Sequence, residues 1–180
     1  MYQTETVVKK ISVHQLFENY WKPDIWCEAC KTCPYYGTLW SCPPGVPNAK
    51  EYLGEFSSVC LIGVKVIYDE ETRKKSIGSE DRYRDLTYNK VRRTILETLL
   101  FMEEIEKNSL TVAAGRCEIC KNCARKDGRP CIYPEKKRYS FSAFGFDITE
   151  IASKELKSPL LWSGNGLPEY DMAIAAYFVK

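Results

Sequence analysis

Eight of the nine cysteines in this sequence fall into two runs with nearly the same spacing. The first run reads C-x2-C-x2-C-x8-C-P and consists of Cys27, Cys30, Cys33 and Cys42. The second reads C-x2-C-x2-C-x7-C-x2-P and consists of Cys117, Cys120, Cys123 and Cys131. Two-residue gaps let consecutive thiolates turn toward one inorganic centre, and a fourth cysteine that returns after a loop completes the shell. The spacing therefore predicts two metal-binding segments, at residues 27–42 and 117–131.

For the second run, the spacing favours an iron–sulfur cluster of the [4Fe–4S] type over zinc. Structural zinc sites usually combine two CxxC pairs that are separated by a longer span. A CxxCxxC triplet instead gathers three ligands on one tight loop, which suits one face of a cubane cluster better than a tetrahedral ion. Zinc held by the four thiolates is the alternative.

The first run leaves more alternatives open. Cys30, Cys33 and Cys42 are predicted ligands, and Cys27 is the expected fourth. If Cys27 is a spare thiol, three cysteines hold an iron that stays open to a substrate. Ligands could also cross between the runs, because in two-cluster ferredoxins the last cysteine of a run serves the other cluster. The expected number of clusters is therefore one or two.

The other reactive side chains offer little further chemistry. Cys60 lies in an apolar stretch, and we expect it to be a buried core thiol. His14 is the only histidine, which excludes metal sites built from several histidines. Motifs for phosphate loops, dinucleotides, serine hydrolases and zinc proteases are missing from the sequence. The sequence therefore gives no support for nucleotide binding or hydrolysis, and it is neutral on whether the protein is an enzyme.

Composition indicates a globular protein, with 44% hydrophobic and 28% charged residues, rather than a disordered one. The longest uncharged apolar stretch, Met172–Val179, is far too short to span a bilayer. The first residues show no secretory leader. We therefore expect a cytoplasmic protein without disulfides. Its many thiolates and oxygen-sensitive sites suit an anaerobe.

Positive charge is concentrated around the second run. The net charge of the chain is +2, but residues 116–138 hold eight basic residues against three acidic ones. Cations near a negative cluster raise its reduction potential and could attract an acidic protein as redox partner. The aromatic residues near the first run have no basic groove beside them, so we expect no nucleic-acid partner. The sequence leaves the oligomeric state open.

The elements that must position the cysteines predict an α+β fold. Apolar, β-branched runs predict strands at Ser58–Tyr68, Leu110–Ala114 and Met172–Val179. The longest predicted helix covers about Ser79–Lys107 and has one apolar face. We expect a single domain, residues 1–180, in which a small mixed sheet of about three strands packs against this helix and carries two cysteine-rich loops. A shorter helix should begin after Ser12 and end at Pro23.

Two longer segments resemble a known family. The sequences CKTCPYYGTLWSCPPGVP (30–47) and GRCEICKNCARKDGRPCIYPEKKRYSFSAFGFDI (115–148) are similar to the "predicted metal-binding protein" family of anaerobic bacteria and archaea, whose activity is uncharacterised. The resemblance implies metal-site roles for seven cysteines: Cys30, Cys33, Cys42, Cys117, Cys120, Cys123 and Cys131. It also marks further positions of the second motif: Pro134, Arg138, Ser140, Gly145 and Asp147.

The chain departs from the family pattern at two places. Cys27 lies outside the core motif, which weakens its implied role as a ligand. Phe141 and Ser142 occupy the stretch where the family usually carries an acidic residue before Ala143, so a role for that carboxylate does not transfer.

Together these features predict an iron–sulfur protein that transfers electrons or assists a redox process. An enzyme that uses an open cluster iron on a small molecule is one alternative. A zinc-stabilised interaction module without catalysis is the other.

Overall fold

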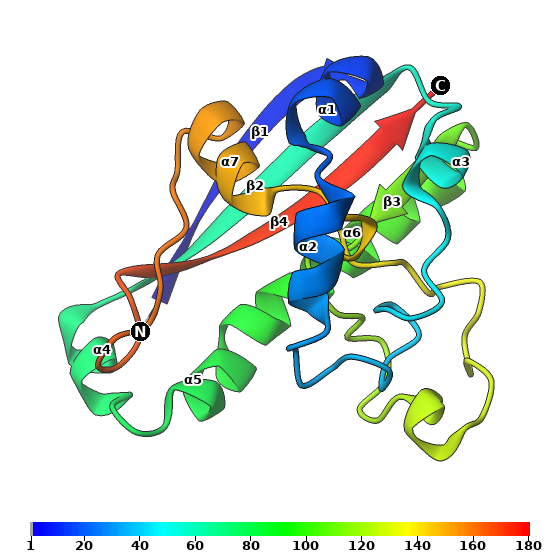
Figure 1. Ribbon diagram of the computed structural model, residues 1–180. Coiled ribbons are helices and arrows are strands. Elements are labelled where there is room, and N and C mark those ends of the chain that lie inside the picture. The colour runs from blue at the N-terminus through cyan, green and yellow to red at the C-terminus, as the bar shows by residue number, and fades with distance from the viewer. Residues whose placement is uncertain (1) are drawn as a thin grey trace.

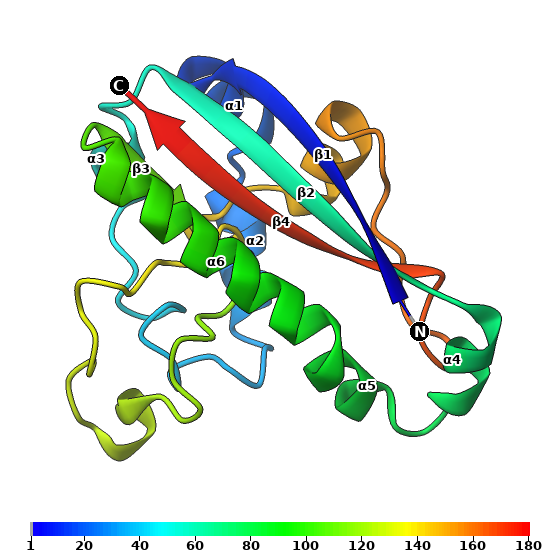
Figure 2. The same cartoon turned by 180° about the vertical axis from the view of Figure 1, so that it is seen from behind.

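The computed structural model describes residues 2–180 and contains a four-stranded sheet. Its strands lie in the order β1-β2-β4-β3, and each neighbouring pair is antiparallel. Helices cover both faces of the sheet, with α1, α2 and α7 on one face (Figure 1) and α6 on the other (Figure 2). The strands are β1 (Tyr2–Ser12), β2 (Ser58–Tyr68), β3 (Ser109–Val112) and β4 (Tyr170–Val179).

The predicted α+β class is confirmed, but the sheet has one more strand than expected and is entirely antiparallel rather than mixed. The missed strand is β1, which pairs with β2 along all eleven of its residues. Its β-branched residues favour a strand, yet most of its side chains are exposed and several are charged. Such a composition is typical of an edge strand, where charges discourage pairing with other chains.

Strand β4 separates two apolar layers through the alternation of its side chains. Met172, Ile174 and Phe178 belong to the main core beneath α1 and the segment around Phe146. On the opposite face of the sheet, the small side chains of Ala173 and Ala175 belong to a second core that contains Leu99 of α6. The small residues on that face leave room for α6 to lie close to the sheet.

The long helix expected over residues 79–107 consists of two helices, α5 (Glu80–Leu86) and α6 (Tyr88–Ile105). Thr87 separates them because its backbone, at φ −130° and ψ −83°, is not helical. The apolar pattern placed Leu99 and Ile95 on the buried face of α6, and both pack in the second core. The pattern missed buried Arg92 and Leu96, and its last member, Ile105, is 70% exposed.

The predicted N-cap at Ser12 is confirmed, because its hydroxyl accepts a hydrogen bond from the N–H of Gln15 at 3.0 Å. The helix that follows ends at Tyr20, before Pro23, and Pro23 begins a second helix that the sequence analysis missed. The helices are α1 (Val13–Tyr20), α2 (Pro23–Cys30), α3 (Ala49–Leu53), α4 (Glu70–Lys75) and α7 (Ile148–Glu150), which continues as a π-helical turn at Ile151–Glu155.

The two cysteine runs lie in different connections of the sheet. The first is in the connection between β1 and β2, and the second follows β3. In both views the two segments lie side by side on the β3 side of the sheet (Figures 1 and 2). Across residues 2–180, no helix has both the length and the apolar composition needed to cross a membrane.

Candidate metal centre

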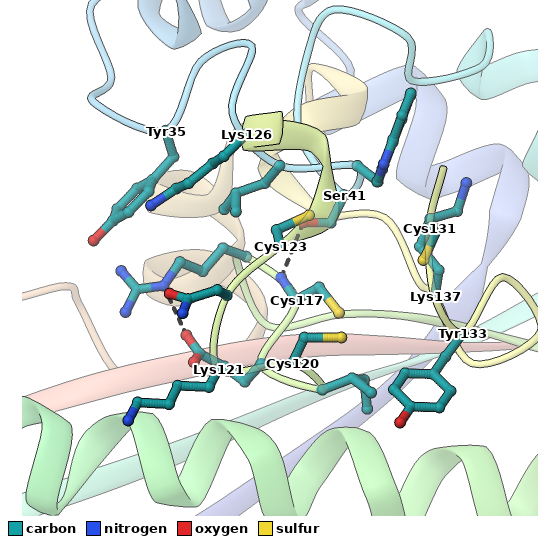
Figure 3. A pocket seen from close by; sticks show the side chains of 16 residues that line it. Tyr35, Ser41, Cys117, Cys120, Lys121, Cys123, Lys126, Cys131, Tyr133 and Lys137 are labelled. Atoms are coloured by element: carbon teal, nitrogen blue, oxygen red, sulfur yellow. Dashed lines mark hydrogen bonds and ion pairs between the residues drawn. The ribbon is translucent and has the colours of Figure 1, made fainter. Parts of the chain in front are cut away.

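The four thiols of the second run line one cavity of about 160 Å³. In Figure 3 the side chains of Cys117, Cys120, Cys123 and Cys131 surround this common space. They come from the largely irregular segment that follows β3, which contains one short 3-10 helix at Ala124–Asp127. Residues of the first run complete the wall, among them Tyr35, Leu39 and Trp40. The cysteines that the spacing predicted as one ligand set are therefore gathered around one space.

Burial and mutual proximity control the protonation of these thiols. Burial raises the pKa of Cys117. Burial, and then the nearby Cys131 and Cys123, raise the pKa of Cys120. Without a metal these two thiols therefore stay protonated at neutral pH. A bound cation favours the thiolate instead, so metal binding here would release protons.

The wall of this cavity is strongly basic. Arg116 forms an ion pair with Glu118 at 2.8 Å, and Glu118 is the only acidic residue of the wall. The other cations of the wall are Lys121, Lys126 and Lys137. Their charges can offset the negative charge that four thiolates bring to a cluster.

Three thiols of the first run, those of Cys30, Cys33 and Cys42, line a second cavity, of about 240 Å³. Helix α2 carries Cys30, and Cys33 follows in a turn where its N–H donates to the Cys30 carbonyl at 3.1 Å. The N–H of Cys42 donates to the Leu39 carbonyl at 3.1 Å. Burial, and then the neighbouring Cys27, Cys33 and Cys42, raise the pKa of Cys30.

Cys27 is placed differently from the other seven cysteines of the two runs. It lies one turn before Cys30 on α2, close enough to affect the pKa of Cys30. It lines a separate cavity, of about 290 Å³, together with Trp21 and Pro44. Cys30, Cys33 and Cys42 thus share a cavity that Cys27 does not line, which agrees with the position of Cys27 outside the family motif.

Ser41 joins the two cysteine sites. It is fully buried, and its hydroxyl accepts a hydrogen bond from the N–H of Cys117 at 2.9 Å. The same hydroxyl lies 3.7 Å from Sγ of Cys42, to which its own hydrogen can be donated. Burial raises the pKa of Cys42, and this bond partly opposes the rise. One side chain therefore contacts the backbone of the second run and a thiol of the first.

Arg125 of the second run also holds the backbone of the first. Its Nη1 donates to the carbonyls of Leu39 at 2.7 Å and Cys42 at 2.9 Å, and its Nη2 donates to the carbonyl of Pro44. Its guanidinium lies 4.8 Å above the ring of Trp40. Since one side chain satisfies three carbonyls, the two runs form a single interlocked unit.

Arg92 anchors the start of the second run to α6. It is 6% exposed, and it donates to the carbonyls of Ala114 and Arg116. Its Nη1 also donates to Glu118 Oε1 at 3.1 Å. Gly115, with φ +79°, passes so close that a Cβ there would lie 2.9 Å from Arg92 Nη2. The glycine therefore lets the chain turn beneath the guanidinium just before Cys117.

The motif after the second run holds α2 in place. Gly145, at φ +86°, comes so near Pro23 that a Cβ would lie 2.7 Å from the Pro23 Cα. Its carbonyl accepts from the N–H of Lys22 at 2.9 Å. Asp147 caps α7 and forms an ion pair with Lys22 Nζ at 3.2 Å. The start of α2, which carries Cys27 and Cys30, is fixed by these contacts.

Two further motif positions also have structural partners. Arg138 donates from Nε to Oε1 of Glu103 in α6 at 2.9 Å. The N–H of Ser140 donates to the carbonyl of Ser41 at 3.0 Å. Phe141 lies in the stretch where the family usually carries an acidic residue, and in this chain it is buried in the main core.

The spacing of the cysteines gave no indication of the roles of Ser41, Arg92 and Arg125. A signal existed for Arg92, because an arginine stood among apolar residues at helical spacing. Two other expectations can be compared with the structure. Cys60 is only half-buried in β2, because it lines an apolar groove between the sheet and α6. His14 is exposed beside Glu18, at 3.6 Å, and contacts neither cysteine run.

The donor set fits a metal that prefers soft thiolate ligands, because both cavities contain cysteine sulfur and no imidazole. As the chain stands, no three Cys, His, Asp or Glu side chains among residues 2–180 are close enough to hold a single metal ion.

Comparison with known proteins agrees with a metal site. The family model described as "Predicted metal-binding protein (DUF2284)" matches residues 9–172, a range that includes both cysteine runs. Neither the curated proteins nor the solved structures contain a match to this chain.

Proposed function

The chain belongs to this family of predicted metal-binding proteins, and we propose that it is a cytoplasmic iron–sulfur protein that transfers electrons. The observation that carries the proposal is the pair of cysteine-lined cavities that share Tyr35 and Arg116 as wall residues. In this proposal, Cys117, Cys120, Cys123 and Cys131 hold one cluster, and the first run, with Cys27 as fourth ligand, holds a second metal centre.

A [4Fe–4S] cluster supplies a one-electron redox couple when it is bound. The protein residues around the second run have two supporting roles. Leu39 and Trp40 cover the cavity with apolar surface, which limits access of water and oxygen. Arg116 and the lysines of the wall place positive charge beside the thiolates, which favours the reduced, more negative state.

The contact between the two runs supports transfer of electrons between two metal centres rather than storage of an electron at one centre. Through the hydroxyl of Ser41, a thiol of the first run is connected to the backbone of the second. Tyr35 and Arg116 line both cavities, and the Arg116 guanidinium lies 4.4 Å above the Tyr35 ring. Metal centres held by the two runs would therefore be close neighbours.

The basic wall also indicates what kind of protein would be the redox partner. Lys121 and Lys126 are exposed beside the second run. Complementary charge speeds the encounter of two proteins and orients them. We therefore propose a partner protein with an acidic surface around its own redox centre.

Protein purified without oxygen is expected to contain iron and acid-labile sulfide in equal amounts, about four of each for every [4Fe–4S] centre. Redox titration should show reversible one-electron steps. Cys120→Ser should remove the iron of the second run, whereas Ser153→Ala on the far α7 segment should not. Stoichiometric zinc without iron or sulfide would contradict the proposal and favour the zinc-stabilised interaction module.

The two thiols of α2 should respond differently to substitution. Cys30→Ala is expected to abolish the first metal centre, because Cys30 shares the cavity with Cys33 and Cys42 and follows Cys27 by one turn of α2. Cys27→Ala should leave most of the metal bound but make one iron exchangeable and alter the electron paramagnetic resonance spectrum, since only the fourth ligand is lost. An unchanged spectrum and metal content in Cys27→Ala would show that Cys27 is not a ligand.

One observation favours a second candidate function, an enzyme with an open iron at the first run. The cavity of Cys30, Cys33 and Cys42 adjoins a larger apolar cavity that could admit a small molecule. A spectrum of the first centre that changes when small molecules are added would support the enzyme over a plain electron carrier.

A further inference from the structure

A cavity of about 610 Å³ lies beside the first cysteine site. Tyr88, Gly115 and Ser142 line both this cavity and the cavity of the three thiols, so the two adjoin. Its walls come from α2, α6, β4 and the loop at residues 160–163, which are far apart in the sequence. Its volume falls within the roughly 300–1,000 Å³ that is typical of small-molecule sites.

The wall of this large cavity is mainly aromatic and aliphatic. Trp26, Phe141 and Met172 contribute apolar surface. Trp162, which also lines it, is 77% exposed, the most exposed of the large hydrophobic side chains among residues 2–180. Exposing an indole is unfavourable unless something covers it, and a flat ring system is a suitable cover.

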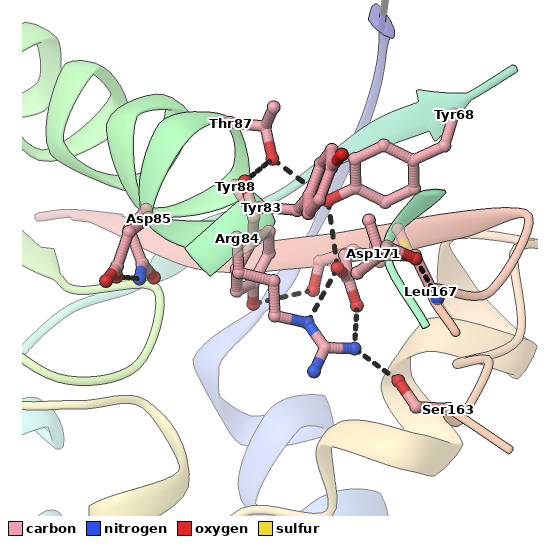
Figure 4. A network of polar contacts seen from close by, with 12 residues as sticks. Tyr68, Tyr83, Arg84, Asp85, Thr87, Tyr88, Ser163, Leu167 and Asp171 are labelled. Carbon is pink, nitrogen blue, oxygen red and sulfur yellow. Dashed lines mark hydrogen bonds and ion pairs between the residues drawn. The ribbon is translucent and has the colours of Figure 1, made fainter. Parts of the chain in front are cut away.

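The charges in the wall cancel. Arg84 and Asp171 are its only charged residues, and they form a two-pronged ion pair, with Nε–Oδ2 at 2.9 Å and Nη2–Oδ1 at 3.0 Å (Figure 4). Asp171 also accepts from the hydroxyl of Tyr68 at 2.9 Å. A wall without net charge favours an uncharged ligand, in contrast to the basic wall around the second run.

Two hydrogen-bond donors of this wall lack an acceptor. The indole Nε1 of Trp26 is buried and has no hydrogen-bond partner within residues 2–180. Arg84 uses Nε and Nη2, the latter also for Ser163 Oγ at 2.6 Å, while its Nη1 donates to no described residue (Figure 4). The Trp26 N–H is unfavourable because it is buried without an acceptor, and Arg84, whose side chain is partly exposed, has a further N–H to donate. A carbonyl oxygen is the natural complement of such donors.

We propose that this cavity binds an uncharged, planar aromatic carbonyl compound beside the first cysteine site. Its apolar walls cover the ring system, and the donors of Trp26 and Arg84 select the carbonyl oxygen. The inference deepens the second candidate function, because it names a ligand class for the open first site. Binding itself depends on the cavity and not on the identity of the metal.

The test uses the anaerobically prepared protein and the fluorescent ketone 6-propionyl-2-(dimethylamino)naphthalene, whose emission shifts to the blue in apolar surroundings. Saturable binding of one molecule per chain with a blue shift is expected. Trp162→Ala should weaken binding about tenfold, since it removes one aromatic wall. Phe101→Ala is the matched control, because Phe101 is 60% exposed on α6 and lines no part of this cavity.

The second arm tests recognition of the carbonyl group. Trp26→Phe keeps an aromatic ring but removes the unpaired N–H, so it should weaken binding of the ketone about three- to tenfold. Binding of 2-(dimethylamino)naphthalene, which lacks the ketone, should be unaffected by this substitution.

Absence of saturable binding would overturn the inference, and so would equal affinities in the Trp162→Ala and Phe101→Ala proteins. Equal weakening of both probes by Trp26→Phe would overturn carbonyl recognition. Failed probe binding in protein with normal iron and sulfide would leave the electron-transfer function standing. Zinc in place of iron, together with normal probe binding, would contradict the electron-transfer function and leave the proposed ligand site standing.

Discussion

Arg92→Met is expected to lower the free energy of unfolding of the metal-free protein by about 2–5 kcal/mol. Methionine keeps an unbranched, apolar side chain but has no donors for the carbonyls of Ala114 and Arg116. Glu118 would lose one of its two ion-pair partners and keep Arg116. Leaving two buried carbonyl acceptors unpaired costs far more than the loss of one surface ion pair. Urea denaturation of the metal-free variant and parent measures the difference.

Arg93→Met provides the matched control. Arg93 is the next residue on α6, is exposed, and donates to the carbonyls of Glu118 at 2.8 Å and Ile119 at 3.3 Å. Its replacement should cost about 1 kcal/mol or less, because water can replace its bonds. Equal, small losses in the two variants would contradict the role of Arg92 as the anchor of the second run. The iron content of the second run should fall in Arg92→Met and remain near normal in the control.

Removal of the metal is expected to accelerate hydrogen exchange by at least about a hundredfold in residues 27–42 and 117–131. Few side chains of these segments are buried. Ala124 is the only buried residue between Arg116 and Tyr139. In the first segment, Leu39 and Ser41 are the buried ones. With so little apolar burial, the two segments depend on metal–ligand bonds to stay ordered.

The central strands should keep their protection in the same experiment. In β2, Val59, Leu61 and Val66 are fully buried, and β4 pairs with both β2 and β3. Hydrogen exchange followed by mass spectrometry, before and after chelation, compares the two regions in one sample. Loss of protection across β2 and β4 would show that the metal holds the whole chain together. Unchanged exchange in both cysteine segments would show that packing alone orders them.

The interlock between the runs has a consequence for assembly of the two sites. Ser41 and Arg125 connect segments about 75 residues apart in the sequence. Ordering one run should therefore help to order the other, because Arg125 cannot reach the carbonyls around Cys42 until both segments are in place. Cooperative uptake of metal by the two sites is the natural result.

The sequence by itself determined the features that depend on short separations along the chain. Two-residue gaps keep the thiols of one run near each other whatever the rest of the fold does, so their gathering around one cavity could be predicted. The apolar runs of β2 and β4 and the hydroxyl cap at Ser12 are equally local signals, and all three appear in the structure.

Tertiary structure alone decided which distant residues complete the sites. Strand β1 was missed because an exposed edge strand carries little apolar pattern, and its pairing with β2 spans the whole first cysteine segment. Arg92 can be buried on α6 because the segment after β3 brings the carbonyls of Ala114 and Arg116 to meet it. Ser41 likewise contacts the backbone of Cys117 because two segments that are distant in the sequence pack together. Such contacts follow from the packing of entire elements, which no spacing within a short segment encodes.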